Sequence, residues 1–461
     1  MNIDEFFTAA AAQQVELVDL RYTLFPGVRR HRTVVLGELK QDGGPGRAAD
    51  ASTLLRDGRR LLSPVPDTAF LDPFCQHPTF AVTCDVNDTL TGRPDPDDLR
   101  AVTRRAQSHL QSTGVADRAD FAPRVEFFVF DQALYDQSIN TARYFVDSRE
   151  GAWRRGRDDP DNLGLQPRPG AAAGLLPPAD SLHNLRGEML AALTACGVRV
   201  GGHERAPAGG GQTAIELRPA PLLTAADALT TTKYIVRSVA ARHGKVVTFM
   251  PKPLFGDDGS GMSTRLALWR DDRPLFPGRS PTGLSDVGRW AMGGLLSHMP
   301  SLLAFVGPTT NSYKRLVPDF GAPTRCAWSH DDMTAAVRAP LIDPNCAADW
   351  LDVRTPDPSC DAYLAYSAIL MAALDGIAHH RDPGAAIDVP TQASTPVSRP
   401  ILPGSLDEAL KALETDHAYL LAGGVFTTDL IQRWVTHKWE NEVRPVQRRP
   451  HPYEFCLYFD V

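Results

Sequence analysis

The chain has 461 residues and lacks long apolar runs, paired cysteines and an excess of positive charge. Its best apolar run, Ala365 to Ile377, is interrupted by Ser367 and Asp375 and is shorter than the roughly 18 residues of a membrane span. The N-terminus carries acidic residues early and lacks the basic stretch and apolar run of a secretory signal. We therefore expect a cytoplasmic protein without a membrane partner.

Cysteine content and charge exclude further classes of protein. The seven cysteines are an odd number without a CxxC pair, a pattern that predicts reduced thiols rather than a disulfide framework or a zinc site. A formal net charge of -7 gives no reason to expect a nucleic-acid partner. The hydrophobic fraction of 43% is typical of globular proteins, and the length suffices for two or three domains.

Local patterns indicate an α+β fold. Residues 15–23 and 33–39 are β-rich runs on either side of a turn, which predicts a hairpin. Asp95, which precedes a proline, predicts the N-cap of a helix that Gly114 ends. Beyond it, residues 124–130 alternate as a strand that places Arg124 and Glu126 on one face. Strands and helices then alternate without a regular βαβ repeat.

Four segments carry a family resemblance: Thr248–Met262 with its glycine turn, Pro308–Pro318, Ala422–Thr427 and the tail Pro450–Val461. They closely resemble type I glutamine synthetases, and weaker similarity covers residues 14–461 in order. The resemblance implies a small N-terminal β-grasp domain, placed at residues 1–105. It also implies a large catalytic domain at residues 106–461, whose antiparallel sheet forms the active-site funnel.

The resemblance also implies an assembly and a reaction. Relatives are homo-oligomers of hexameric rings, usually dodecamers, in which the loop around Asp50 and Ser52 reaches into the next subunit's site. Their reaction uses ATP and two Mg²⁺ or Mn²⁺ ions to join a small-molecule carboxylate to an amine. Asp50 is thereby a candidate catalytic residue.

The first metal site of the family consists of three glutamates. Glu126 and Glu204 match two of them, whereas Ala214 stands at the third position, after an apparent insertion of two glycines at residues 209–211. Glu216 follows two residues later, and side chains two apart on a strand share a face. The resemblance therefore allows one metal site built from Glu126, Glu204 and Glu216.

The second metal site is rewritten, which predicts its loss. Arg124 stands at a family glutamate and Ser263 at a family histidine, leaving Asp352 as a shortened carboxylate ligand. A guanidinium cannot ligate a cation, and Arg265 replaces a further histidine. These two arginines predict fixed positive charge that faces a substrate anion. The alternative is that Arg124 pairs with a neighbouring acid such as Asp352.

The substrate side is better kept. Arg315, Arg338 and Arg354 match family arginines that hold carboxylate and phosphoryl oxygens. A substrate-binding role is also implied for Gly259 and for Asp258, which replaces an asparagine. No basic residue remains between Arg338 and Asp352, where relatives contact ATP, so ATP binding is not expected to be intact.

Gly321 replaces the family's flap glutamate, which closes over the amine and removes its proton. The change removes a negative charge and opens space for a bulkier amine. Two functions remain. The chain is either a divergent carboxylate-amine ligase that uses an amine other than ammonia, or an inactive structural or regulatory subunit that assembles with an intact paralogue.

Overall fold

A computed structural model describes the chain except for residues 42–55, 161, 281, 344–345, 348 and 388–399. The predicted catalytic residue Asp50 therefore lies outside the described residues. None of the helices in the described part is long and apolar enough to cross a membrane.

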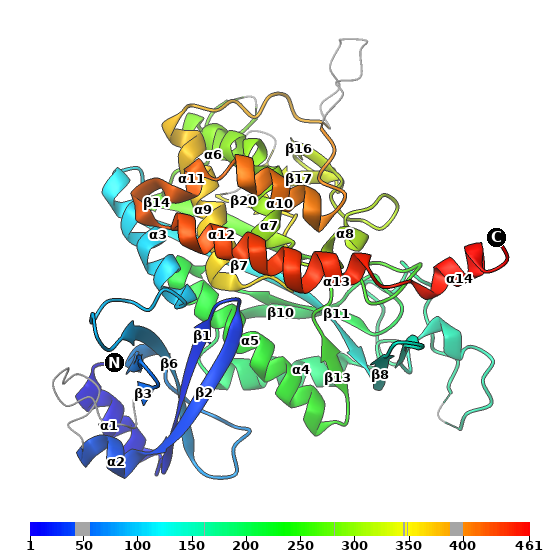
Figure 1. The fold of residues 1–461 in the computed structure, drawn as a ribbon, viewed down its shortest axis with the longest axis horizontal. Helices are drawn as coiled ribbons and strands as arrows, with labels where there is room; N and C mark the ends of the chain where they lie inside the picture. Colours follow the sequence, from blue (N-terminus) through cyan, green and yellow to red (C-terminus); the bar gives the residue numbers. More distant parts are fainter. Residues whose placement is uncertain (42–55, 161, 281, 344–345, 348, 388–399) are drawn as a thin grey trace.

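The N-terminal part is a six-stranded sheet covered by the first helices (Figure 1). Its strand order is β2-β1-β6-β4-β3, with β5 paired to β6. β1 pairs parallel with β6 and antiparallel with β2, which confirms the predicted hairpin. The bounds predicted for its second strand were wrong, because β2 begins at Val28 and residues 36–41 form a helix. The elements are α1 Ile3–Ala12, β1 Leu17–Leu24, β2 Val28–Val35, α2 Leu36–Gln41, β3 Arg56–Asp57, β4 Arg60–Pro64, β5 Phe70–Leu71 and β6 Thr79–Asp88.

The larger part contains a ten-stranded sheet of order β10-β11-β7-β14-β20-β17-β16, with β12 and β13 beside β7 and β15 beside β14. Its neighbours are antiparallel except β16 and β17. Together with the helices, this confirms the predicted α+β class and antiparallel sheet. The strands are β7 Arg118–Phe130, β10 Val200–Arg205, β11 Gln212–Leu217, β12 Ala220–Pro221, β13 Val246–Thr248, β14 Met262–Arg270, β15 Arg273–Pro274, β16 Arg325–Ser329, β17 Ala335–Arg338 and β20 Leu351–Val353.

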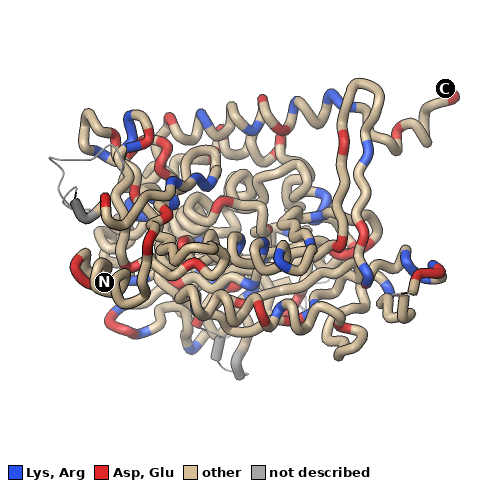
Figure 2. Tube along the Cα trace, turned by 90° about the horizontal axis from the view of Figure 1, so that it is seen from below, with Lys and Arg blue, Asp and Glu red and all other residues tan. Residues whose placement is uncertain are grey.

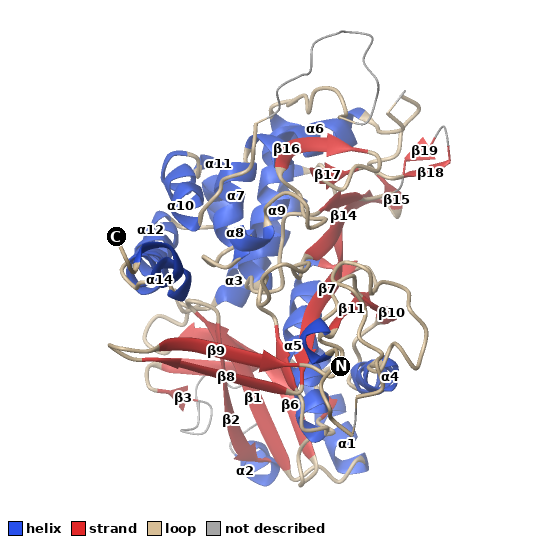
Figure 3. Ribbon diagram, turned by 90° about the vertical axis from the view of Figure 1, so that its right-hand side faces the viewer, coloured by secondary structure: helices blue, strands red, loops and turns tan. Residues whose placement is uncertain are grey.

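Helices pack together beside β7 and β14 (Figure 3). The central one, α9, is buried along nearly its whole length and crosses α6 where Gly294 and Gly376 meet. A Cβ on Gly376 would lie 2.4 Å from the Gly294 nitrogen, so the crossing requires glycine. The helices are α3 Leu99–Thr113, α4 His183–Ala195, α5 Leu222–Arg242, α6 Asp286–Ser297, α7 Met299–Val306, α8 Ser312–Arg315, α9 Ala362–Ala378, α10 Leu406–Thr415, α11 Ala418–Leu421, α12 Thr428–Lys438, α13 Arg444–Gln447 and α14 Pro452–Tyr458.

Helix α3 joins the two parts. The prediction that Asp95 caps it was wrong, because Asp98 is the N-cap and accepts a hydrogen bond from the Arg100 nitrogen at 3.0 Å. Gly114 ends the helix in the left-handed region, as predicted. The predicted domain boundary at 105/106 falls inside α3, whose buried face from Leu99 to Leu110 belongs to the larger core.

A buried histidine ties three helical segments together. His298 precedes α7 and lies between Asp375 on α9 and Asp416 after α10, at 2.8 and 2.9 Å. Burial alone would lower the pKa of His298, but its hydrogen bonds to Asp416 and Asp375 raise that pKa above the ordinary value. His298 and these two carboxylates therefore form a hydrogen-bonded cluster that links α7, α9 and the end of α10.

Candidate functional site

Three transverse rows of side chains lie on one face of the large sheet. Strand register places Glu204, Ala214 and Glu126 side by side across β10, β11 and β7. The next row runs from Gly202 through Glu216 and Arg124 to Ser263. The third row contains Arg265, Asp352 and Arg338. These rows bring the predicted site residues of four distant segments to one surface.

Arg124 reaches from the second row into the first. Its Nε donates to Glu204 at 2.6 Å and its Nη1 donates to Glu126. Ala214, fully buried, lies between these two carboxylates in the register. Burial would lower the pKa of Arg124, but the attraction of Glu126 and Glu204 raises it above the usual value. The small side chain at 214 therefore leaves the space that the guanidinium needs.

Asp352 is neutralised from two sides. Ser263 donates its hydroxyl hydrogen to one oxygen, and Arg338 forms an ion pair with the other at 2.9 Å. Arg124 does pair with acids, as the alternative prediction stated, but these acids are Glu126 and Glu204 and not Asp352. Arg265 lies opposite Asp352 in the register, is exposed, and holds its guanidinium over the Trp350 ring at 4.9 Å.

Two further arginines lie deep beside this face. Arg315 is buried and donates to the Thr355 carbonyl at 2.6 Å, while its Nε has no hydrogen-bond partner. Arg354 donates to the carbonyl oxygens of Met333 and Gly321. Burial and the repulsion of Arg338 lower the pKa of Arg354 to about 10. A buried cation whose charged form is disfavoured is stabilised when an anion binds beside it.

The glycine turn at residues 256–261 places backbone close to these arginines. A Cβ on Gly259 would lie 2.5 Å from the Pro251 carbonyl and 2.8 Å from Arg315 Cγ, so this close approach needs glycine. The Gly261 nitrogen donates to Glu126 at 2.7 Å. Gly261 thereby separates the carboxylate of Glu126 from the guanidinium of Arg315.

Asp258 faces Gly321 across the mouth of this turn. A Cβ on Gly321 would lie 3.8 Å from Asp258 Oδ1, and one on Gly170 would lie 3.4 Å from Oδ2. Burial and the neighbouring Asp257 raise the pKa of Asp258. Opposite it, Lys252 has its ammonium over the Phe320 ring at 3.5 Å, and burial lowers its pKa. Lys252 was not predicted from the sequence, although it lies in the recognised segment 248–262.

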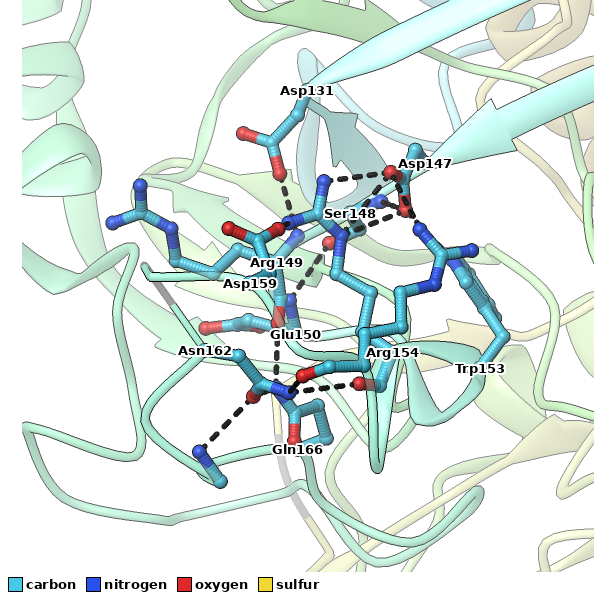
Figure 4. Close-up of polar contacts among 12 residues, drawn as sticks. Asp131, Asp147, Ser148, Arg149, Glu150, Trp153, Arg154, Asp159, Asn162 and Gln166 are labelled. Carbon is cyan, nitrogen blue, oxygen red and sulfur yellow. Dashed lines mark hydrogen bonds and ion pairs between the residues drawn. The ribbon is translucent and has the colours of Figure 1, made fainter.

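A long loop supports the edge of this site (Figure 4). Asp147 accepts hydrogen bonds from Trp153 Nε1 at 2.8 Å and from Arg154 at 2.6 Å, which fixes the Trp153 ring. That ring lies 3.3 Å from where a Cβ on Gly210 would be, and Gly211 has a φ of 91°. The glycines at 209–211 therefore form a turn that packs under the Trp153 ring, where a side chain on Gly210 would not fit.

The structure places the predicted residues as follows. Glu126 and Glu204 lie together but share Arg124, while Glu216 lies one row away beside Arg124 in the register. No group of three or more His, Cys, Asp or Glu side chains in the described part of the chain is arranged to hold a metal ion. The sequence could not show the Arg124 bridge, because it depends on register across three strands.

Comparisons with known proteins agree with this fold. Residues 96–458 match the family model for the catalytic domain of glutamine synthetase. Glutamine synthetases of Microchaete diplosiphon and Frankia alni are 41% and 42% identical, each over 97% of both chains. That of Mycobacterium tuberculosis is 42% identical over 99% of both chains. The chain therefore belongs to the glutamine synthetase family, as the four sequence segments predicted.

Solved structures give the same result for the fold. Plasmodium falciparum glutamine synthetase superposes with a TM-score of 0.85 at 22% identity, covering 99% of each chain. A structure titled as a GmaS/ADP complex superposes with a TM-score of 0.76 at 26% identity, covering 98% of this chain and 99% of the other.

Proposed function

We propose that this chain is a divergent carboxylate-amine ligase of the glutamine synthetase family that transfers a γ-glutamyl-type acyl group to an amine other than ammonia. The observation that carries the proposal is the Arg124 bridge between Glu126 and Glu204, at the centre of an otherwise retained arginine site. The guanidinium of Arg124 supplies positive charge between Glu126 and Glu204, where two carboxylates alone would bind a divalent cation.

The donor set does not fit a divalent ion between these glutamates. Both carboxylates already bind Arg124, Ala214 lacks a donor atom, and Asp352 is bound to Ser263 and Arg338. Family members normally use divalent metals and ATP, and we propose that this chain differs from them at this place. In the proposed reaction, the buried Arg315 and Arg354 stabilise the anionic oxygens, because Arg124 is already bound by two carboxylates.

The acid substrate is assigned to the buried arginines. Arg315 has a free Nε, and Arg354 is held beside Arg338 with its charge only partly compensated. Guanidinium groups bind carboxylate and phosphoryl oxygens with directed hydrogen bonds. The role proposed for Gly259 is steric, because its lack of a side chain lets the backbone approach Arg315.

The amine is assigned to the space between Asp258 and Gly321. Gly321 leaves room beside the Asp258 carboxylate, which is half-buried and forms no ion pair with any of the described residues. A carboxylate with a raised pKa in this position suits proton removal from an attacking amine. We propose Asp258 as that general base, replacing a flap carboxylate.

Two exposed apolar surfaces support a homo-oligomer, for which ring assemblies of the family are the expected form. Helix α14 extends away from the body (Figure 1) and exposes Phe455 and Phe459. The β8–β9 hairpin (Gln132–Gln137 and Ala142–Asp147) exposes Tyr135 and Ile139. Apolar patches of this kind mark interaction surfaces.

Turnover with a panel of amines tests the ligase. Purified protein is supplied with ATP, Mg²⁺ or Mn²⁺, glutamate and either ammonia, alkylamines or diamines, and ADP release and the amide product are measured. We expect product with an organic amine at a rate above that with ammonia. Absence of nucleotide binding by titration calorimetry, with and without glutamate, refutes the ligase.

The second candidate is an inactive subunit that assembles with an intact paralogue. The same Arg124 bridge favours it, because a neutralised carboxylate row also suits a purely structural role. Nucleotide binding with no turnover for any amine, together with co-assembly with an active relative, would support this candidate over the ligase.

A further inference from the structure

A cavity of about 1420 Å³ lies between the N-terminal sheet and the larger part, next to the arginine site but distinct from it. Its walls come from β1, β2, helix α5 and the segments around 248–251, 308–311 and 358–362. In Figure 1 the β1–β2 hairpin lies beside α5, and Arg29 at the start of β2 donates to the Thr230 carbonyl on α5 at 2.9 Å. None of Arg124, Glu126 and Arg315 lines it.

The charge of this cavity is opposite to that of the whole chain. Charges of both signs are interspersed along the trace (Figure 2), and the sequence carries a net charge of -7. Among the described residues, two carboxylates line the cavity, those of Asp19 and Asp361. Against these two, six basic side chains line it: Arg21, Arg29, Arg30, Lys233, Arg237 and Lys438.

Three of these cations form no ion pair with any of the described residues. Arg29 donates to a backbone carbonyl, and Lys233 donates to the Cys360 carbonyl at 2.8 Å. Arg237 lies over the Phe249 ring at 4.8 Å. Burial is the main cause that lowers the pKa of each of the three. Arg29 and Lys233 are partly buried and Arg237 is exposed, so an anion that enters the cavity meets cations that no described carboxylate pairs with directly.

An unsatisfied donor gives independent evidence for an anion. Arg21 is 6% exposed and pairs with Asp19 and Asp72, yet its Nη1 has no hydrogen-bond partner. Buried donors are almost always satisfied, so an orphan on a cavity wall marks a place for an acceptor. The ring of Tyr234 lies 4.2 Å from the Arg21 guanidinium and holds it in position.

We propose that this cavity is a binding site for a small polyanionic metabolite, whose phosphate or carboxylate oxygens are held by Arg29, Lys233 and Arg237. The site is separate from the proposed catalytic one but shares a wall with it. The Pro251 carbonyl accepts from the Ser260 nitrogen of the glycine turn at 2.7 Å. An occupant of the cavity therefore contacts the segment that positions Gly259, as an effector would.

Titration calorimetry on the full chain tests this proposal with two probes, inorganic pyrophosphate and citrate, which separate phosphate from carboxylate recognition. We expect one equivalent of either probe to bind per chain. Lys233→Met and Arg237→Met should each weaken binding by about tenfold or more, because each removes a charge-assisted contact. Arg242→Met is the matched control, since Arg242 lies on the same helix over the Phe74 ring at 4.6 Å but does not line the cavity.

The outcomes are distinct. Binding of either probe that is weakened by Arg237→Met and unaffected by Arg242→Met supports the site, and the preferred probe identifies the acidic group. Failure of both probes to bind the wild-type chain overturns the proposal. A change of oligomer mass on Arg237→Met, without probe binding, would assign the cavity to a neighbouring copy instead. The readout needs no catalytic activity, so it is independent of the proposed ligase.

Discussion

Replacing Arg124 with methionine is expected to destabilise the chain and create affinity for a divalent ion. The change removes the guanidinium that pairs with Glu126 and Glu204, whose side chains are 14% and 53% exposed. Removing one partner of a buried pair costs about 3–5 kcal/mol, whereas an exposed pair is worth up to about 1 kcal/mol. Because the burial of these ion pairs lies between the two cases, we expect the free energy of unfolding to fall by roughly 2 kcal/mol.

The same variant frees two carboxylates for a metal. At Mn²⁺ concentrations about 100 times the dissociation constant, binding to the folded state adds about 2.7 kcal/mol. Thermal unfolding with and without Mn²⁺ should therefore show a lower midpoint for Arg124→Met that Mn²⁺ restores. The wild-type chain should respond much less at the same concentrations.

Arg118→Met is the control on the same strand. Arg118 pairs with Asp120 and with the exposed Asp272, so its loss should cost less than about 1 kcal/mol and gain no Mn²⁺ response. An equal Mn²⁺ shift in the wild-type chain and in Arg124→Met would refute the idea that Arg124 occupies the cation position.

Gly376→Ala should lower the free energy of unfolding by more than about 3 kcal/mol, because the methyl group overlaps the crossing helix. Gly187→Ala, in open space on α4, should raise it by about 0.5–1 kcal/mol. Thermal unfolding of the two variants compares these effects. The raised pKa of His298 means that its contribution to stability is complete below the unfolded value of 6.5 and is lost as pH rises through the folded value. Unfolding of His298→Gln should accordingly depend less on pH between about 6 and 8 than unfolding of the wild-type chain. In the proposed ligase, Asp258→Asn should lower the turnover number by about 100-fold or more and remove the acidic limb of its pH profile, with little change in fold by circular dichroism.

Local features of the fold were predictable from sequence. The hairpin of β1 and β2 follows from β-rich runs on either side of a turn, and the end of α3 follows from Gly114. The start of α3 was not predictable, because both Asp95 and Asp98 are residues that can serve as an N-cap. Only the folded structure shows that Asp98 accepts a hydrogen bond from the Arg100 nitrogen and is therefore the N-cap.

The sequence determined the family, because family membership depends on residue type and order along the chain. From the family resemblance it predicted that Arg124 and Gly321 replace carboxylates and that Ala214 stands where a glutamate is expected. The tertiary structure decided which groups these charges meet. Strand register sets contacts between residues about 80 positions apart, and a shift of one residue would turn Arg124 to the opposite face. The cationic cavity likewise exists only where the N-terminal sheet meets α5, since its walls come from segments that carry no shared pattern in the sequence.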